Sequence, residues 1–160
     1  MPIFPIKWIV CIWCKKIPKD KKTRPLKDLV KESIFNLISH SNKFNCKIEK
    51  SNILDLFSGT GSFGLECISR GASKVTFIEN YPETVKILKK NINHLNCEKK
   101  SQIIEEDIFK IKSLSSLHKE KFEVIFLDPP YKEKKLNHLL KNIIYLKLLK
   151  KKGLIIMHRN

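Results

Sequence analysis

The hydrophobic residues of this chain fall into short continuous runs that are separated by longer, mixed blocks. The short runs are rich in β-branched and aromatic residues, which predicts strands buried on both faces of a parallel sheet. The expected strands are Ile53 to Phe57, Lys74 to Glu79, Gln102 to Glu105, Phe122 to Leu127 and Gly153 to His158. A further apolar run, Trp8 to Trp13, could form an edge strand.

The longer blocks have helical spacing. From Leu26 to Ile38 the apolar residues fall mainly on one face of a helix, which opens at Thr23-Arg-Pro-Leu. Further helices are expected at Phe63 to Arg70, Pro82 to Leu95 and Leu136 to Leu149, with a short helix or turn at Ser113 to His118. Strands that alternate with helices form βαβ units, so the sequence predicts an α/β fold with a doubly wound, mostly parallel sheet.

A glycine-rich turn follows the strand Ile53 to Phe57. We expect Gly59 and Gly61 to allow positive φ and close approach of a ligand, and Gly64 to let the next helix pack tightly on the strand. The first amides of that helix would point, unpaired, into the turn and favour an anionic group. Such a turn serves nicotinamide dinucleotides, flavins and S-adenosylmethionine alike.

Four acids stand at or just past the ends of the expected strands: Asp55, Glu79, Asp107 and Asp128. In a parallel sheet, ligands sit beyond these carboxyl ends. Asp55 favours S-adenosylmethionine, which carries an ammonium and a sulfonium, over a dinucleotide, whose phosphates need no acid there. Glu79 is placed to bind ribose hydroxyls. Each acid taken singly could equally be a turn or helix-cap residue.

The most specific motif is Asp128-Pro129-Pro130-Tyr131. Proline has no N–H, so this peptide offers only carbonyl oxygens. Together with the Asp128 carboxylate they form a group of acceptors suited to the two hydrogens of an exocyclic amine, whose lone pair would then face the methyl donor. Tyr131 can stack on the base, contributing roughly 1–3 kcal/mol. A buried turn with a core tyrosine is the alternative interpretation.

Composition bears on the partner more than on the fold. A chain of 160 residues suits one domain, and its formal net charge of +16 favours a polyanion such as nucleic acid. An AT-rich genome would also enrich lysine, so charge alone leaves this open. The five scattered cysteines favour a reducing cytoplasm, and Cys11 and Cys14 lack a second pair that would complete a zinc site. No apolar run is long enough to span a bilayer.

Three segments in this order resemble one known family: Arg24 to Asn36, Asp55 to Glu66 and Asp128 to Tyr131. They are similar to the bacterial methyltransferases that modify the exocyclic N2 amine of guanine in small-subunit (16S) ribosomal RNA. The resemblance covers about Lys15 to His158. It implies a Rossmann-like class I fold, S-adenosyl-L-methionine as the methyl donor, and ribosomal RNA or an assembling 30S particle as the partner. The implied methyl transfer requires no metal, and we expect the protein to be a monomer.

The resemblance also implies roles for single residues. Arg24 would close over the methionine end of the cofactor, and Asp107 would accept from the adenine amino group beside the Ile108 amide. The expected cofactor-binding residues are Arg24, Asp55, Phe57, Gly59, Gly61, Gly64, Glu79, Asn80, Asp107 and Ile108. The expected catalytic residues are Asp128, Pro129, Pro130 and Tyr131.

Both ends of the chain depart from the family pattern. Family members begin with a glycine-containing strand pair and continue past the fifth strand into an antiparallel hairpin. We therefore expect an atypical strand and basic loop at residues 1–23, a methyltransferase domain at residues 24–160, and a fifth strand left as an uncovered edge. Two other interpretations stay open: an adenine N6 methyltransferase on DNA or RNA, and a truncated, inactive RNA-binding module.

Overall fold

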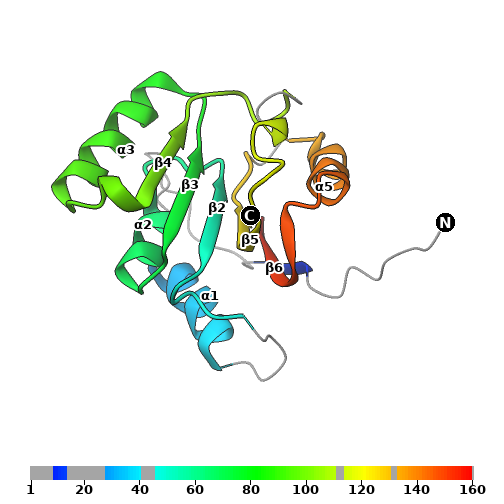
Figure 1. The fold of residues 1–160 in the computed structure, drawn as a ribbon, viewed down its shortest axis with the longest axis horizontal. Coiled ribbons are helices and arrows are strands. Elements are labelled where there is room, and N and C mark those ends of the chain that lie inside the picture. Colours follow the sequence, from blue (N-terminus) through cyan, green and yellow to red (C-terminus); the bar gives the residue numbers. More distant parts are fainter. Residues whose placement is uncertain (1–8, 14–27, 41–45, 111–113, 131–132, 160) are drawn as a thin grey trace.

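The computed structural model describes residues 9–13, 28–40, 46–110, 114–130 and 133–159, with only the backbone for residues 9–13, 28–29 and 159. The described residues form one sheet of parallel strands in the order β1-β6-β5-β2-β3-β4 (Figure 1). The strands are β1 (Ile9–Trp13), β2 (Asn52–Leu56), β3 (Lys74–Ile78), β4 (Ser101–Ile104), β5 (Phe122–Leu127) and β6 (Leu149–Arg159). The predicted parallel α/β fold is confirmed.

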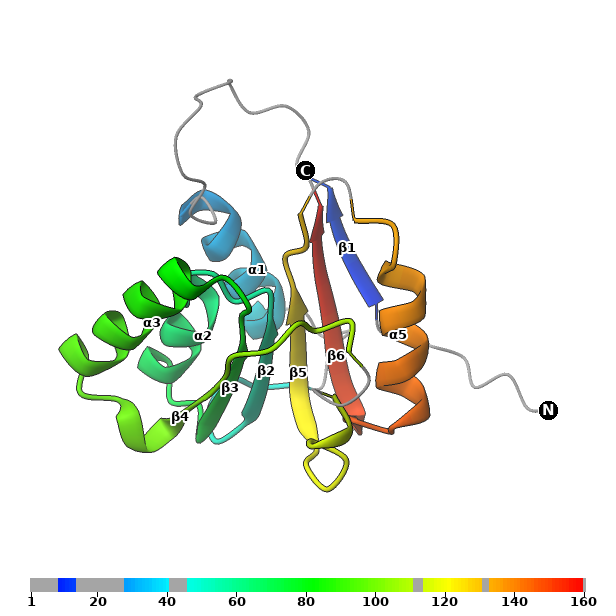
Figure 2. The ribbon, with the colours of Figure 1, turned by 90° about the horizontal axis from the view of Figure 1, so that it is seen from above.

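Helices cover both faces of this sheet (Figure 2). The helices are α1 (Asp28–His40), α2 (Ser62–Ser69), α3 (Pro82–His94) and α5 (Leu136–Tyr145), with a 3-10 turn η1 (Glu98–Lys100). Side chains of α1, α2 and α3 pack on one face, and those of α5 pack on the other. No helix in the described part of the chain has the length and apolar character needed to cross a membrane.

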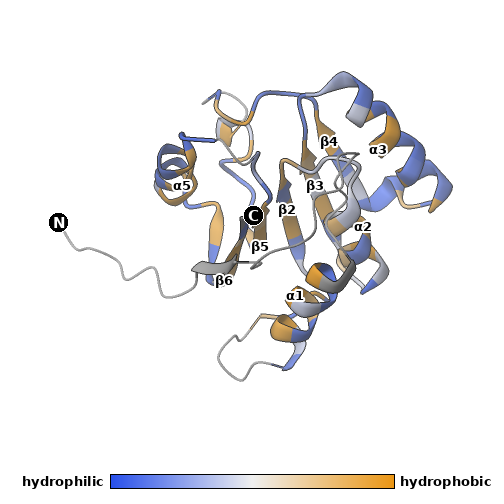
Figure 3. Cartoon of the chain, turned by 180° about the vertical axis from the view of Figure 1, so that it is seen from behind, coloured by the Kyte–Doolittle hydropathy of each residue, from blue (hydrophilic) through white to orange (hydrophobic). Residues whose placement is uncertain are grey.

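Alternate residues of each central strand belong to different cores. In β5, Val124 and Phe126 pack with α1 and α2, whereas Ile125 and Leu127 pack with α5. This alternation is expected for a strand buried on both faces. Figure 3 shows the hydrophobic residues on the strands and on the inner sides of the helices. The same alternation places Asp55 of β2 on the α2 side, between Leu54 and Leu56, which face α5.

Two expectations about the C-terminal part of the fold are wrong. The last helix ends at Tyr145 rather than Leu149, because Lys147 adopts a positive φ of 52° and Leu148 N–H donates to Ile143 O, which closes the helix in the manner usually given to glycine. The strand β6 is also not an uncovered edge. It pairs with β1 from Ile9↔Ile155 to Trp13↔Arg159.

Candidate active site

The turn between β2 and α2 reverses the chain through three residues with positive φ. These are Phe57 at 60°, Gly59 at 56° and Gly61 at 85°, where Gly61 is the N-cap of α2. Gly61 N–H donates to Ser58 O at 2.8 Å, which closes the turn. The expected positive φ at both glycines is confirmed, whereas the same conformation at Phe57 was not predicted.

The glycines of this turn meet different surroundings. A Cβ atom at Gly64 would lie 2.3 Å from Phe77 Cε1 and 2.8 Å from Val75 Cγ1, so only glycine allows α2 to approach β3 this closely. The same Cβ atom would lie 2.9 Å from Oδ2 of Asp55 on β2, so the expected tight packing of α2 on β2 is confirmed. A Cβ atom at Gly59 would meet no described heavy atom within 4 Å. With respect to the described part of the chain, Gly59 thus has open space beside it.

Asp55 is a buried carboxyl that holds the start of α2. Asp55 is only 1% exposed, and its Oδ2 accepts a hydrogen bond of 3.0 Å from Gly64 N–H. The sequence predicts that the first amides of α2 are unpaired. This is wrong for the third of them, Gly64 N–H, because it donates to the Asp55 carboxyl on the adjoining strand. The other oxygen, Oδ1, has no hydrogen-bond partner among the described residues.

The environment of Asp55 disfavours its charge. The pKa of Asp55 is raised to about 8, mainly by burial and in smaller part by the carboxylates of Asp128 and Glu79, against the opposing effect of the Gly64 hydrogen bond. These two acids act on Asp55 because the ends of β3 and β5 flank the end of β2. The structure therefore brings three of the four predicted acids to one place.

Glu79 ties the end of β3 to the glycine turn. Its Oε2 accepts from Gly59 N–H at 2.8 Å, and its Oε1 accepts from Asn80 and Tyr81 N–H at 3.0 and 2.9 Å. Because a carboxylate oxygen has two lone pairs, Oε2 retains room for a further donor.

Asp128 follows β5 directly and lies beside β2. Its N–H points to Leu56 O at 3.4 Å, and its Oδ1 lies 2.8 Å from Nδ1 of His158, at the end of β6. The Asp128 side chain is 32% exposed. In the same motif the Pro130 carbonyl accepts from Glu133 N–H at 3.0 Å, so this one of the expected acceptors is already engaged in a turn. Tyr131 lies outside the described residues.

His158 is a residue that the sequence reasoning did not select. Its signal was a polar residue at the end of an otherwise apolar strand, but its partner depends on the pairing of β5 with β6, in which Leu127 lies opposite Met157. That register places the next residues of the two strands, Asp128 and His158, side by side.

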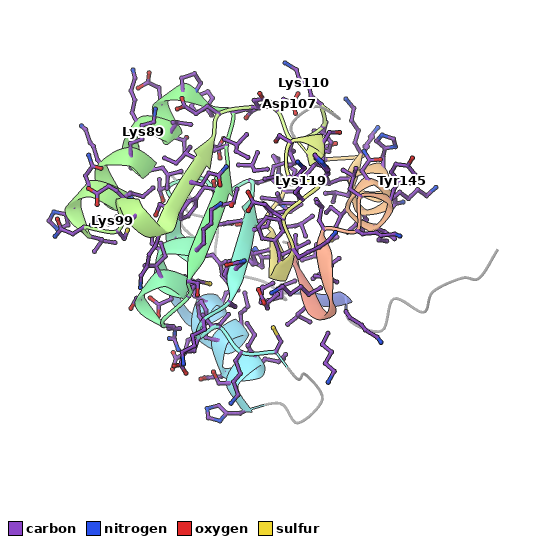
Figure 4. All side chains as sticks on the ribbon, in the orientation of Figure 1. Lys89, Lys99, Asp107, Lys110, Lys119 and Tyr145 are labelled. Atoms are coloured by element: carbon purple, nitrogen blue, oxygen red, sulfur yellow. The ribbon has the colours of Figure 1, made fainter. Side chains whose placement is uncertain are left out.

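Asp107 lies past the end of the edge strand β4. Its Oδ1 accepts from Phe109 N–H at 3.0 Å, and Ile108 is buried. Figure 4 shows Asp107 and Lys110 together at this edge of the molecule. The Phe109 ring lies 5.7 Å from that of Phe57, which links this turn to the glycine turn.

The charge of the site is opposite to that of the chain. No lysine or arginine among the described residues forms an ion pair with Asp55, Glu79 or Asp128, although the chain carries 32 Lys and Arg against 16 Asp and Glu. Arg24, which was expected near this site, is not among the described residues. The described residues also include no group of three or more His, Cys, Asp or Glu that could hold a metal ion. The arrangement suits an organic cation.

Comparisons with known proteins identify the family of this chain. The family model described as "Conserved hypothetical protein 95" matches residues 15–160. The Bacillus subtilis protein named "Putative rRNA methyltransferase YlbH" is 36% identical over 134 residues, which cover 84% of this chain and 70% of that protein. The ribosomal RNA small subunit methyltransferase D of Haemophilus influenzae is 35% identical over 133 residues, covering 79% of this chain and 64% of the relative.

Solved structures show the same fold. A Haemophilus influenzae crystal structure described as "putative methylase HI0767" is 33% identical, with a TM-score of 0.62 over 82% of this chain and 79% of that one. A crystal structure described as "SMU.776, a putative methyltransferase complexed with SAH" has a TM-score of 0.62 at 21% identity, over 79% of this chain and 34% of that one, which shows the shared fold alone. From the family match and these identities, the chain belongs to the family described as conserved hypothetical protein 95, that of the ribosomal RNA small subunit methyltransferases D.

Proposed function

We propose that this protein transfers a methyl group from S-adenosyl-L-methionine to the exocyclic N2 amine of a guanine in 16S ribosomal RNA. The names of its relatives support the reaction and the RNA class. The observation that carries the chemistry is the meeting of Asp55, Glu79 and Asp128 at one site that has no lysine or arginine partner among the described residues. A donor with an ammonium and a sulfonium is the kind of ligand that such a site attracts.

The residues around the glycine turn fit the donor. Asp55 Oδ1 is buried and without a described partner, so a cationic or N–H group of the donor would satisfy it. Gly59 leaves room for close approach to the backbone, and Glu79 Oε2 would accept from a ribose hydroxyl. By family resemblance Asp107 and Ile108 would bind the adenine. The donor supplies an activated methyl group, so the protein itself needs no nucleophile.

The acceptors after β5 would hold the substrate amine. We assign this task to the Asp128 carboxylate and to the carbonyl oxygens of Asp128 and Pro129, since the Pro130 carbonyl already accepts from Glu133. Two accepted N–H groups aim the nitrogen lone pair at the methyl carbon. As the C–N bond forms and the C–S bond breaks, the nitrogen becomes cationic. It then loses one proton to Asp128 or to water.

The rim of the site suits RNA. Lys135 Nζ lies 5.6 Å from the centroid of the Phe109 ring, which itself lies 5.7 Å from the Phe57 ring of the glycine turn, so a cation and an aromatic face adjoin that turn. The remaining lysines, with a formal net charge of +16 on the chain, would bind phosphates. A guanine in a loop costs the least free energy to extrude into such a pocket, because it is not base-paired. We propose that a monomer acts in the cytoplasm, on RNA or on an assembling 30S particle.

The test is to identify the methylated nucleoside. The protein is incubated with labelled S-adenosylmethionine and with small-subunit RNA or 30S particles that lack the modification, and the RNA is digested to nucleosides. We expect label in N2-methylguanosine. Label in N6-methyladenosine would overturn the guanine assignment. Saturable donor binding without any transfer to either substrate would indicate an inactive RNA-binding module.

A further inference from the structure

The imidazole of His158 is buried at the end of β6 and contacts a single acid. His158 is 4% exposed, and its Nδ1 lies 2.8 Å from Asp128 Oδ1. Among the described residues no other side chain or backbone group donates to the Asp128 carboxylate. The contact bridges the ends of two neighbouring parallel strands.

The location of the proton follows from the surroundings of the ring. A carboxylate oxygen and an unprotonated Nδ1 are both acceptors, so a contact of this length requires a proton between them. His158 Nε2 is buried and has no hydrogen-bond partner among the described residues. The contact with Asp128 therefore places an N–H on Nδ1 of His158, and this N–H donates to Asp128 Oδ1.

This hydrogen bond leaves one oxygen of Asp128 for the substrate. A carboxylate on a partly exposed side chain can rotate about χ2, which is a soft torsion. Donation from Nδ1–H to Oδ1 fixes that rotation and keeps Oδ1 from competing for the amine. We propose that His158 is a positioning residue. Its Nδ1–H holds the Asp128 carboxylate in the orientation in which Oδ2 accepts a hydrogen bond from the amine of the substrate base. This inference rests on the proposed role of Asp128.

Three substitutions separate positioning from packing. His158→Asn retains an N–H donor at the place of Nδ1, His158→Gln carries its donor one bond farther out, and His158→Leu has no donor. We expect the Leu and Gln variants to lose at least about tenfold in kcat, with KM for RNA and the Kd for S-adenosylmethionine unchanged. The Asn variant should stay within a few-fold of the wild-type kcat.

A second measurement tests whether His158 acts through Asp128. The His158→Leu change is made in an Asp128→Ala background, where we expect no further loss of kcat because the group that His158 positions is already absent. A full additional loss in the double variant would show that His158 acts elsewhere and would overturn the inference.

The remaining outcomes are also decisive. If His158→Leu keeps the wild-type kcat while Asp128→Ala loses it, the inference fails and the proposed function stands. If Asp128→Ala itself keeps full activity, the proposed role of Asp128 is wrong, and the inference about His158, which rests on it, is overturned as well. If the Asn, Gln and Leu variants lose activity or thermal stability equally, the role of the ring is structural, and the inference is overturned.

Discussion

The acids at the two ends of β5 have different kinds of partner. At the amino end of β5, Glu123 Oε2 accepts from Asn52 N–H at 2.7 Å and Oε1 pairs with Lys150, in a region where Cys46 and Arg70 line an open hollow. At the carboxyl end of the same strand, Asp128 has only the imidazole of His158 as a described partner.

The difference indicates where a ligand belongs. A chain with this excess of lysine can neutralise an acid readily, as Lys74 does for Glu120 and Lys89 does for Glu105. Neighbouring carboxylates that have no described cation beside them destabilise the folded protein through mutual repulsion and burial, unless a bound group offsets both effects. We therefore propose that the carboxyl ends of β2, β3 and β5 bind a ligand, whereas the acid at the amino end of β5 stabilises the fold.

The largest expected effect comes from removing the acid at each end of β5 in turn. Asp128→Ala should lower kcat for RNA methylation by at least about 100-fold while S-adenosylmethionine still binds, because the amine loses its carboxylate acceptor. The matched control, Glu123→Ala, should keep kcat. It should lower the free energy of unfolding by about 1–3 kcal/mol, since the Asn52 amide loses its acceptor. Equal losses of kcat in the two variants would contradict the comparison.

A second test separates packing from ligand approach within the carboxyl end. Gly64→Ala should lower the free energy of unfolding by about 3 kcal/mol, because the new methyl would collide with Phe77 and Val75. Gly59→Ala should cost about 1 kcal/mol, since its Cβ enters open space at a positive φ of 56°. Chemical denaturation measures both. If Gly59→Ala leaves the affinity for S-adenosylmethionine unchanged, Gly59 is not part of the cofactor site.

The raised pKa of Asp55 predicts how cofactor binding depends on pH. In the free protein Asp55 is mostly protonated below about pH 8, whereas a cationic donor favours the ionised form. Binding then releases a proton, so Kd should fall as pH rises from 6 toward 8, by up to about tenfold per unit, and level off above. Calorimetry at several pH values measures this. The control, Asp55→Asn, keeps an acceptor for Gly64 and should lose this part of the pH dependence, which also corrects for titration of the donor's own amine.

The smallest expected effect is at the surface. Lys150→Ala removes the cation beside Glu123 but leaves the bond to Asn52 in place. Because the pair is partly exposed, the free energy of unfolding should change by less than about 1 kcal/mol, and the change should shrink at high salt. A decrease of several kcal/mol in the free energy of unfolding would show that the Lys150–Glu123 ion pair, and not the hydrogen bond to Asn52, stabilises the amino end of β5.

Most elements were predictable because they depend on local patterns. A run such as Phe122–Leu127 is apolar except for Glu123, and the glycines after Leu56 end a strand and begin a helix. The end of α5 was not predictable, since the left-handed residue there is Lys147 and not glycine. The pairing of β1 with β6 was also missed, because strand order depends on contacts between distant parts of the chain.

The sequence by itself determined the alternation of strands and helices, the glycine turn and the acids at strand ends, since each depends on neighbouring residues. Only the tertiary structure decided what those acids touch: Asp55 holds Gly64 N–H, Glu79 holds Gly59 N–H, and Asp128 meets His158. The physical reason is register. A side chain's partners across a parallel sheet come from strands far away in the chain, and a shift of one residue would turn each of them to the other face.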